Sequence, residues 1–252
     1  MQATDPKGGD LVRRHHLFTR AWHWINLVAV TVMLMSGLMI FNAHPRLYWG
    51  HYGANAKGHP DQAWLDLGHL NGGVPFPPWI TIPSHYSLAD ARLWHFAFAW
   101  VLGTALVLYL GWGLVRGHLR RDLAPRLAEL APAHLWHDIK QHARLRFPTG
   151  AAALRYNILQ KLAYGSVLIV MLPVTVLTGL TMSPGLDAAF PWLIDLFGGR
   201  QSARSIHFLC TAGLAGFFLV HIAMVILAGP INELRSMLTG WYRLPQDRED
   251  QA

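Results

Sequence analysis

The chain has 252 residues, of which 52% are hydrophobic and only 14% are charged, whereas soluble domains carry about 25% charged residues. Together with a mean hydropathy of +0.24, this composition excludes an ordinary soluble globular protein and indicates lipid as the main solvent. A single cysteine, Cys210, excludes an internal disulfide framework, a four-cysteine zinc site and a self-contained iron–sulfur cluster.

The N-terminal tail is polar and basic, and the apolar run after it is too long for a signal-peptide core, so we expect no cleaved signal. Four segments are each long and apolar enough to cross about 30 Å of hydrocarbon as a helix: residues 21–41, 93–115, 159–182 and 206–228. Because these segments lack the alternation of barrel strands, we predict an all-α, integral membrane four-helix bundle. Residues 1–252 are treated as a single membrane domain.

The connections between the predicted spans differ in character. Residues 44–90 form a long loop rich in Pro, Gly, Trp and His, which is typical of a functional or partner-binding surface, although Trp-rich stretches also lie at lipid headgroups. The next connection contains AHLWHDIKQHARLRF, in which Leu135, Ile139 and Ala143 share one helical face. This pattern predicts a short amphipathic helix on the membrane surface. In the third span, Pro173 predicts a kink.

Lysine and arginine predict the orientation of the bundle. Sixteen of the 21 lie in the two tails and in the connection between the second and third spans, and five lie in or beside the other two connections. This bias predicts that both termini are cytoplasmic and that the 44–90 loop is on the outer side. The net charge of +7 is therefore explained by topology and anionic membrane lipid, and nucleic acid is not an expected partner.

Only four of the fifteen histidines lie inside the predicted spans: His23, His95, His207 and His221. Fourteen residues separate the last two, which places them within about 40° of one helical face and about 21 Å apart along it. With cytoplasmic termini, His95 and His207 share the outer depth, whereas His23 and His221 share the inner depth. Two such pairs are what two stacked, six-coordinate b-type haems require. The alternative is that these histidines hydrogen-bond between helices of a haem-free transporter or structural bundle.

Two further patterns accompany these histidines. Three of them follow an arginine at a spacing of three residues, which places the guanidinium on the same helical face, one turn nearer water and suited to a haem propionate; these are Arg20, Arg92 and Arg204. An arginine at a helix end also snorkels without any ligand. Small residues in the spans either let a flat macrocycle approach the backbone or serve plain helix packing; they are Gly37, Gly103, Gly179 and Gly213.

Three motifs carry a resemblance to a known family: R-x-W-H-W at residues 20–24, R-L-W-H-F at residues 92–96, and the H-x13-H of His207 and His221. Over residues 13–244 the chain resembles the bacterial di-haem cytochrome b membrane subunits of formate dehydrogenase, thiosulfate reductase and nickel–iron hydrogenase. The resemblance implies a bundle that holds two b haems and exchanges electrons between quinone and a catalytic subunit on the outer face. It also implies the pairing of His23 with His221 and of His95 with His207.

We therefore expect an electron-transfer subunit of the bacterial inner membrane that links quinone with a periplasmic molybdenum, iron–sulfur or nickel–iron enzyme. Polar residues near the inner histidine pair are candidates for the quinone pocket, although each also suits an interface anchor: Asn26, His118, Asn157, Gln160 and Tyr164. One alternative is a stand-alone membrane oxidase, for example one that takes electrons from superoxide. The other is the haem-free bundle.

Overall fold

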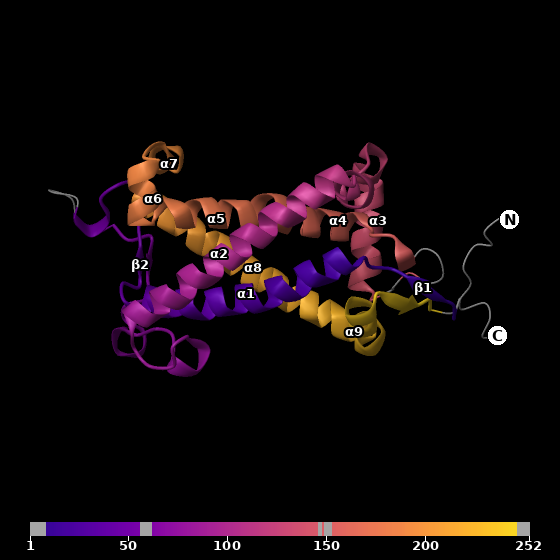
Figure 1. Ribbon diagram of the computed structural model, residues 1–252, viewed down its shortest axis with the longest axis horizontal. Coiled ribbons are helices and arrows are strands. Elements are labelled where there is room, and N and C mark those ends of the chain that lie inside the picture. The colour runs from indigo at the N-terminus through magenta and orange to yellow at the C-terminus, as the bar shows by residue number, and fades with distance from the viewer. Residues whose placement is uncertain (1–8, 56–61, 146–147, 149–152, 246–252) are drawn as a thin grey trace. The chain divides into compact units, whose positions relative to one another are not determined.

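The computed structural model describes residues 9–55, 62–145, 148 and 153–245. Within these residues, four helical segments are long and apolar enough to span a membrane: Leu17–Asn42, Leu88–Val115, Ile158–Thr181 and Arg200–Ala228. They match the four predicted spans, which are thereby confirmed (Figure 1). Three of them begin several residues before the predicted start, because each helix also includes a polar first turn that hydropathy does not mark.

Three of the spans are single helices, α1 (Leu17–Asn42), α2 (Leu88–Val115) and α8 (Arg200–Ala228). The third span consists of α4 (Ile158–Gly165), a π-helical segment (Ser166–Met171) and α5 (Leu172–Thr181). Pro173 is the second residue of α5, two positions after the end of the π-helical segment. Because proline has no N–H and crowds the preceding turn, the irregularity expected at this residue takes the form of widened turns.

Short elements connect the spans. The helices among them are α3 (Pro132–Ala143), α6 (Pro184–Ala189), α7 (Trp192–Leu196) and α9 (Pro230–Thr239). The strands are β1 (Leu11–Arg13), β2 (Arg46–Leu47), β3 (Leu65–Asp66) and β4 (Trp241–Arg243). Helix α3 confirms the helix predicted in the connection between the second and third spans. Helices α6, α7 and α9 and the strands were not predicted from the sequence, because they are too short to show a clear period.

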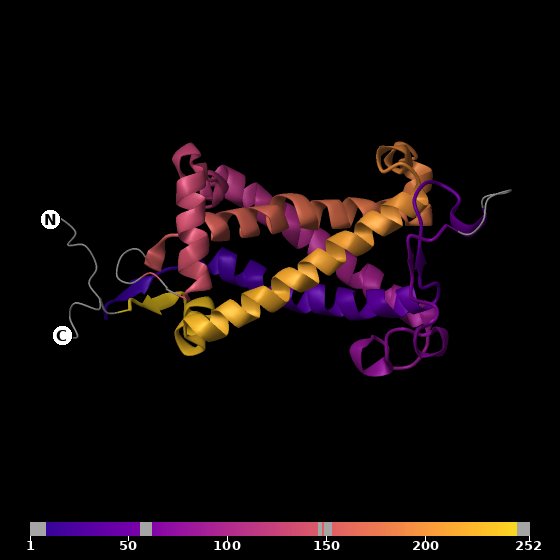
Figure 2. The ribbon, with the colours of Figure 1, turned by 180° about the vertical axis from the view of Figure 1, so that it is seen from behind.

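Contacts divide the chain into two compact units, of which unit 1 comprises the described parts of residues 1–24, 107–168 and 216–252. In unit 1, β1 pairs with β4 in antiparallel register, with Leu11 opposite Arg243. Figure 2 shows these two strands side by side next to α9. The Arg14 guanidinium lies 3.1 Å from the Glu233 carboxylate of α9 and 4.4 Å from the centroid of the Tyr242 ring of β4. These contacts join segments from near the two ends of the chain.

Unit 2 comprises the described parts of residues 25–106 and 169–215 and contains most of the long connection between α1 and α2. This connection is tied to the helices by hydrogen bonds. Asn42 at the end of α1 donates to the Phe76 carbonyl at 2.9 Å and accepts from the Phe76 N–H at 3.0 Å. Trp64 donates to Ser205 of α8 at 2.9 Å, and Ser205 donates to the Tyr48 carbonyl at 2.6 Å. The described parts of the long loop are therefore attached to the helices of unit 2.

A close backbone approach holds the same loop against the start of α8. Gly199 has a φ of +110°, and a Cβ atom there would lie 2.5 Å from the Gly50 carbonyl oxygen. Only glycine fits this position, because any other residue would meet both an unfavourable backbone conformation and a steric clash with backbone. The neighbouring Gly198, with a φ of +69°, meets only the Ser202 hydroxyl at 3.8 Å.

We predict that Gly199→Ala destabilises unit 2 by at least about 3 kcal/mol, because strain and a backbone clash add, whereas Gly198→Ala costs about 1 kcal/mol from left-handed backbone strain alone. Thermal unfolding in detergent, with limited proteolysis of the 44–90 loop, measures both. Equal effects of the two substitutions would show that the contact with Gly50 has no structural weight.

Candidate haem-ligand sites

The structure brings the four histidines of the spans together as two pairs. His95 of α2 faces His207 of α8 within unit 2, with ring centroids 6.2 Å apart and ring planes at 59°. His23 of α1 faces His221 of α8 within unit 1, also at 6.2 Å and 59°. We call these the unit 2 pair and the unit 1 pair. They are the pairs expected from the topology.

His95 is oriented by two hydrogen bonds from α1. Its Nδ1 lies 3.1 Å from the Met33 carbonyl oxygen and 3.1 Å from the Ser36 hydroxyl. A carbonyl only accepts, so Nδ1 carries the proton and Nε2 keeps its lone pair. The Ser36 hydroxyl donates its own proton to the Val32 carbonyl at 2.7 Å, which leaves its oxygen to accept from the imidazole.

His207 is oriented in the same way from α5. Its Nδ1 lies 2.9 Å from the Thr175 carbonyl oxygen and 3.1 Å from the Thr178 hydroxyl. The Thr178 hydroxyl donates to the Val174 carbonyl at 2.7 Å. Both rings of the unit 2 pair therefore have Nδ1 protonated and Nε2 available as a ligand, which is the arrangement in which a second hydrogen bond orients a metal-binding histidine.

The unit 1 pair is surrounded by aromatic rings. Phe217 stacks on His221 with centroids 5.8 Å apart and an interplanar angle of 13°, and Trp24 meets His23 edge-on at 5.1 Å. Among the described residues, Nδ1 of His23 is buried and has no hydrogen-bond partner. The rings of this pair are thus held by packing to a greater extent than those of the unit 2 pair.

Both pairs have the spacing that a shared metal ion needs. A metal is held at about 2 Å by an imidazole nitrogen, and the ring centroid lies about 1 Å behind that nitrogen, so two axial imidazoles have centroids about 6 Å apart. The observed 6.2 Å agrees with this value. No group of three or more His, Cys, Asp or Glu side chains suited to a metal ion occurs in the part of the chain that the structure describes. The donor sets therefore suit a haem, which supplies its other ligands itself.

Comparison with known proteins agrees with this chemistry. A sequence profile described as prokaryotic cytochrome b561 matches residues 14–240. The chain belongs to this family. A putative protein-methionine-sulfoxide reductase subunit, YedZ1, of Azospira oryzae is 31% identical, covering 84% of this chain and 90% of the relative. Probable Ni/Fe-hydrogenase B-type cytochrome subunits of Azotobacter vinelandii and Azotobacter chroococcum are 24% and 23% identical, each covering 92% of this chain and 88% of the relative.

The protein is therefore a b-type cytochrome, a multi-pass protein of the bacterial membrane that transports electrons as a subunit of an oxidoreductase. The resemblance seen in the sequence motifs is confirmed. The haem-free alternative is set aside, because the family consists of b-type cytochromes.

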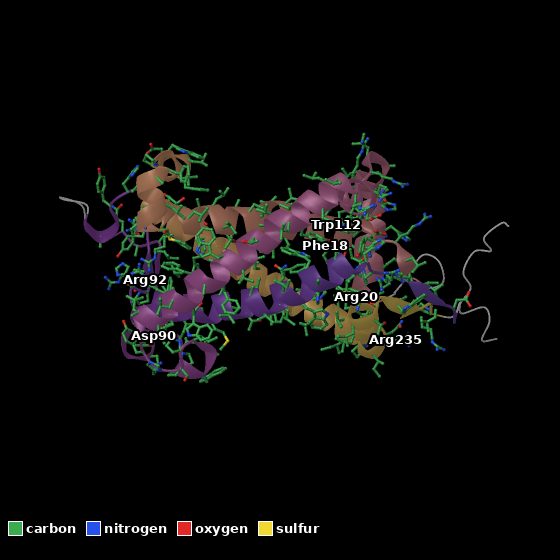
Figure 3. All side chains as sticks on the ribbon, viewed as in Figure 1. Phe18, Arg20, Asp90, Arg92, Trp112 and Arg235 are labelled. Carbon is green, nitrogen blue, oxygen red and sulfur yellow. The ribbon has the colours of Figure 1, made fainter. Side chains whose placement is uncertain are left out.

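The three arginines have different surroundings in this cytochrome. Arg20 donates to the carbonyls of Met237 and Leu238 near the end of α9. Arg204 donates to the His44 carbonyl at 2.5 Å. The guanidinium of Arg92 lies 5.5 Å from the centroid of the Phe96 ring, which is one turn further along α2. Figure 3 labels Arg92 near the start of that helix. Two of the three guanidiniums thus donate to backbone carbonyls. Because a guanidinium has five N–H donors, each still has donors available for further hydrogen bonds.

The four glycines separate into three cases. A Cβ at Gly37 would lie 3.4 Å from Cε1 of His95, and a Cβ at Gly179 would lie 3.4 Å from Cε1 of His207. A Cβ at Gly213 would lie 2.4 Å from the end of Met171, so this glycine serves helix packing. Gly103 has nothing within 4 Å. Two of the four therefore lie against the imidazoles of the unit 2 pair, where an added Cβ would be in ordinary van der Waals contact with the ring.

The polar residues proposed for a quinone pocket also have different surroundings. Asn157 and Gln160 form a reciprocal cap at the start of α4, which is a structural role. Tyr164 packs edge-on against Phe217 at 6.1 Å. His118 donates from Nδ1 to Asp122 at 2.6 Å, with Nε2 lying 3.3 Å from the Tyr109 hydroxyl. Asn26 lies on α1 just after the point where the helix enters unit 2, so it is not in the same unit as the unit 1 pair.

His118 and Asp122 lie at a cavity of about 350 Å³ in unit 1. Its walls also include Phe18 and Trp112, whose rings stack with centroids 5.0 Å apart and are seen next to each other in Figure 3. Burial and the charge of Arg14 lower the pKa of the nearby His15 to about 4, with smaller effects from His23 and His118. His15 is therefore neutral at pH 7.

Sequence reasoning missed the hydroxyls of Ser36 and Thr178. Their only mark in the sequence is that each directly precedes one of the two glycines that face an imidazole. Ser-Gly and Thr-Gly steps are ordinary in membrane helices, so the signal becomes specific only when the facing helix is known.

Proposed function

We propose that this cytochrome binds two b-type haems, one between His95 and His207 and the other between His23 and His221. The observation that carries the proposal is the repeated geometry of the two pairs, each with 6.2 Å between ring centroids and 59° between planes. A bound haem would supply one-electron oxidation and reduction. The imidazoles would fill both axial positions, which disfavours oxygen binding and favours electron transfer.

We further propose that the cytochrome is a single domain of the inner membrane with both termini in the cytoplasm. The pairing of β1 with β4 supports a common side for the two ends, and the distribution of lysine and arginine supports the cytoplasmic side. Helices α1, α2 and α8 each pass without a break from one unit into the other, which supports one domain. The guanidiniums of Arg20, Arg92 and Arg204 are proposed partners of the haem propionates.

Single substitutions to alanine test the haem pairing. His95→Ala and His207→Ala should each remove the same haem, and His23→Ala and His221→Ala should each remove the other, because one axial ligand is lost in each case. Absorption spectra and the haem content of the purified protein provide the measurement. His134→Ala, a substitution on α3 outside both pairs, is the control. Loss of the same haem from the His95 and His221 variants would contradict the pairing.

The unit 1 cavity supports quinone as the exchangeable substrate on this side of the cytochrome. Its volume is in the range of small-molecule sites, and the stacked rings of Phe18 and Trp112 suit a flat ring. His118 is held by Asp122 through Nδ1, and its Nε2, which lies 3.3 Å from the Tyr109 hydroxyl, would accept a proton from a quinol hydroxyl that takes the place of Tyr109. The cavity belongs to the same unit as the unit 1 pair, which is where the transferred electrons are proposed to enter or leave.

We predict that His118→Ala slows the reduction of the haems by a soluble quinol analogue by about a hundredfold, because the proton acceptor is lost. Reduction by dithionite should remain unchanged. His134→Ala is a matched control, because His134 also lies four residues before an aspartate that it contacts, Asp138, at 3.9 Å. Stopped-flow absorbance measures both reactions. An unchanged quinol rate in the His118 variant would contradict this site.

We propose a periplasmic redox enzyme as the second partner. The relatives are named as subunits of a methionine-sulfoxide reductase and of Ni/Fe-hydrogenases, and the single cysteine of this chain cannot hold an iron–sulfur cluster or nickel–iron centre. A molybdenum, iron–sulfur or nickel–iron enzyme would therefore supply the catalytic centre. Large aromatic side chains are exposed on the connection between α1 and α2 and suit docking: Trp49, Tyr52, Trp79 and Tyr86.

Purification of the tagged full-length chain from its native membrane in mild detergent tests this partner. We expect a redox enzyme to accompany the wild-type protein, and a variant with Trp49, Tyr52 and Trp79 replaced by serine to recover less of it while keeping its haem spectrum. A cytochrome that is isolated alone and passes electrons from superoxide to quinone would instead establish the stand-alone oxidase.

A further inference from the structure

The same arrangement of a carbonyl, a hydroxyl and a glycine faces each histidine of the unit 2 pair. We call this arrangement the device. On α1, residues Met33, Ser36 and Gly37 face His95. On α5, residues Thr175, Thr178 and Gly179 face His207. In both cases the carbonyl belongs to the first residue, the hydroxyl to the residue three positions on, and the open face to the residue four positions on. The device thus occurs twice, once on α1 and once on α5.

Each part of the device has a physical reason. A helix carbonyl already accepts the N–H of the residue four positions on, so a second donor approaches the carbonyl beside that residue. Gly37 and Gly179 are these residues. The hydroxyls of Ser36 and Thr178 donate to carbonyls four residues back, at 2.7 Å in both cases. Each hydroxyl oxygen is therefore directed as an acceptor toward Nδ1 of the facing imidazole.

We propose that Ser36 and Thr178 are positioning residues for the haem of the unit 2 pair. By accepting from Nδ1, each hydroxyl fixes the tautomer and the ring orientation and makes Nε2 a stronger donor to iron. A stronger axial donor favours the oxidised metal, so the two hydroxyls lower the reduction potential of this haem. This inference rests on the proposed ligation by His95 and His207.

The device is confined to one of the two pairs. Within the described residues, Nδ1 of His23 is buried without a hydrogen-bond partner, so the unit 1 pair lacks the same support on at least one ring. Removal of a hydroxyl from the device should therefore change one haem and leave the other at its wild-type potential.

The decisive variants change the hydroxyl and keep the shape. Thr178→Val removes the hydroxyl from a side chain of the same size, and Thr178→Ser keeps the hydroxyl. Thr181→Val is the matched control, because Thr181 lies on the same helix, is fully buried and donates to the carbonyl four residues back at 2.9 Å. Ser36→Ala is the independent test on α1. All variants are studied as the full haem-loaded cytochrome.

Redox titration followed by absorbance should show one haem raised in potential in the Thr178→Val and Ser36→Ala proteins. We expect about a threefold to tenfold change in its ratio of oxidised to reduced form, which is below the roughly 10–100-fold loss of metal affinity that follows removal of such a partner. This change is about 30 to 60 mV for a one-electron couple. Thr178→Ser and Thr181→Val should match the wild type. The haem that shifts should be the one lost from His207→Ala.

The haem content and the reduction potentials of the variants distinguish a failure of this inference from a failure of the proposed ligation. If His207→Ala keeps both haems, the ligation is wrong. If His207→Ala loses one haem but neither Thr178→Val nor Ser36→Ala changes a potential, the positioning role alone is overturned. A shift of equal size in Thr181→Val would also overturn it. If Thr178→Val loses the haem altogether, Thr178→Ser must retain it for the positioning role to stand.

Discussion

The hydrogen bond between an imidazole and a neighbouring helix is the interaction on which the described site depends. In hydrocarbon, a helix satisfies its own backbone, and water does not supply partners for a side chain at depth. Nδ1 of His95 and of His207 therefore needs an acceptor from the helix packed against it, and Met33 and Thr175 supply carbonyls with a free lone pair. The two glycines that follow these hydroxyl residues, Gly37 and Gly179, lie against the two imidazoles.

The two pairs differ in the contacts that hold their rings. The unit 2 pair is held mainly by polar contacts from α1 and α5, whereas the unit 1 pair is held mainly by aromatic packing from Phe217 and Trp24. Helix α8, which has 29 residues, contributes one histidine to each pair. Two proposed haem sites with the same spacing but different surroundings would give one small protein two distinct redox environments.

The short elements outside the spans have a supporting role. Arg20, three residues before His23, binds the last carbonyls of α9, and Trp24 donates to the Met237 carbonyl of that helix at 3.2 Å. The motif that contains a haem-ligand candidate is thus also the anchor of a surface helix. A single arginine is able to serve both purposes because its planar guanidinium offers several donors. The spacing R-x-x-H therefore does not by itself distinguish a cofactor contact from a structural one.

The sequence by itself determined the four spans, the absence of cysteine-based centres and the four histidines at depth, because apolar length and the scarcity of polar residues are properties of composition along one chain. It also predicted which histidines face each other, since a helix reverses direction at each crossing. Only the tertiary structure decided what surrounds each ring. The roles of Ser36, Thr178 and α9 depend on contacts between segments distant in sequence, and a hydroxyl or a short helix has no period that reveals such a contact in advance.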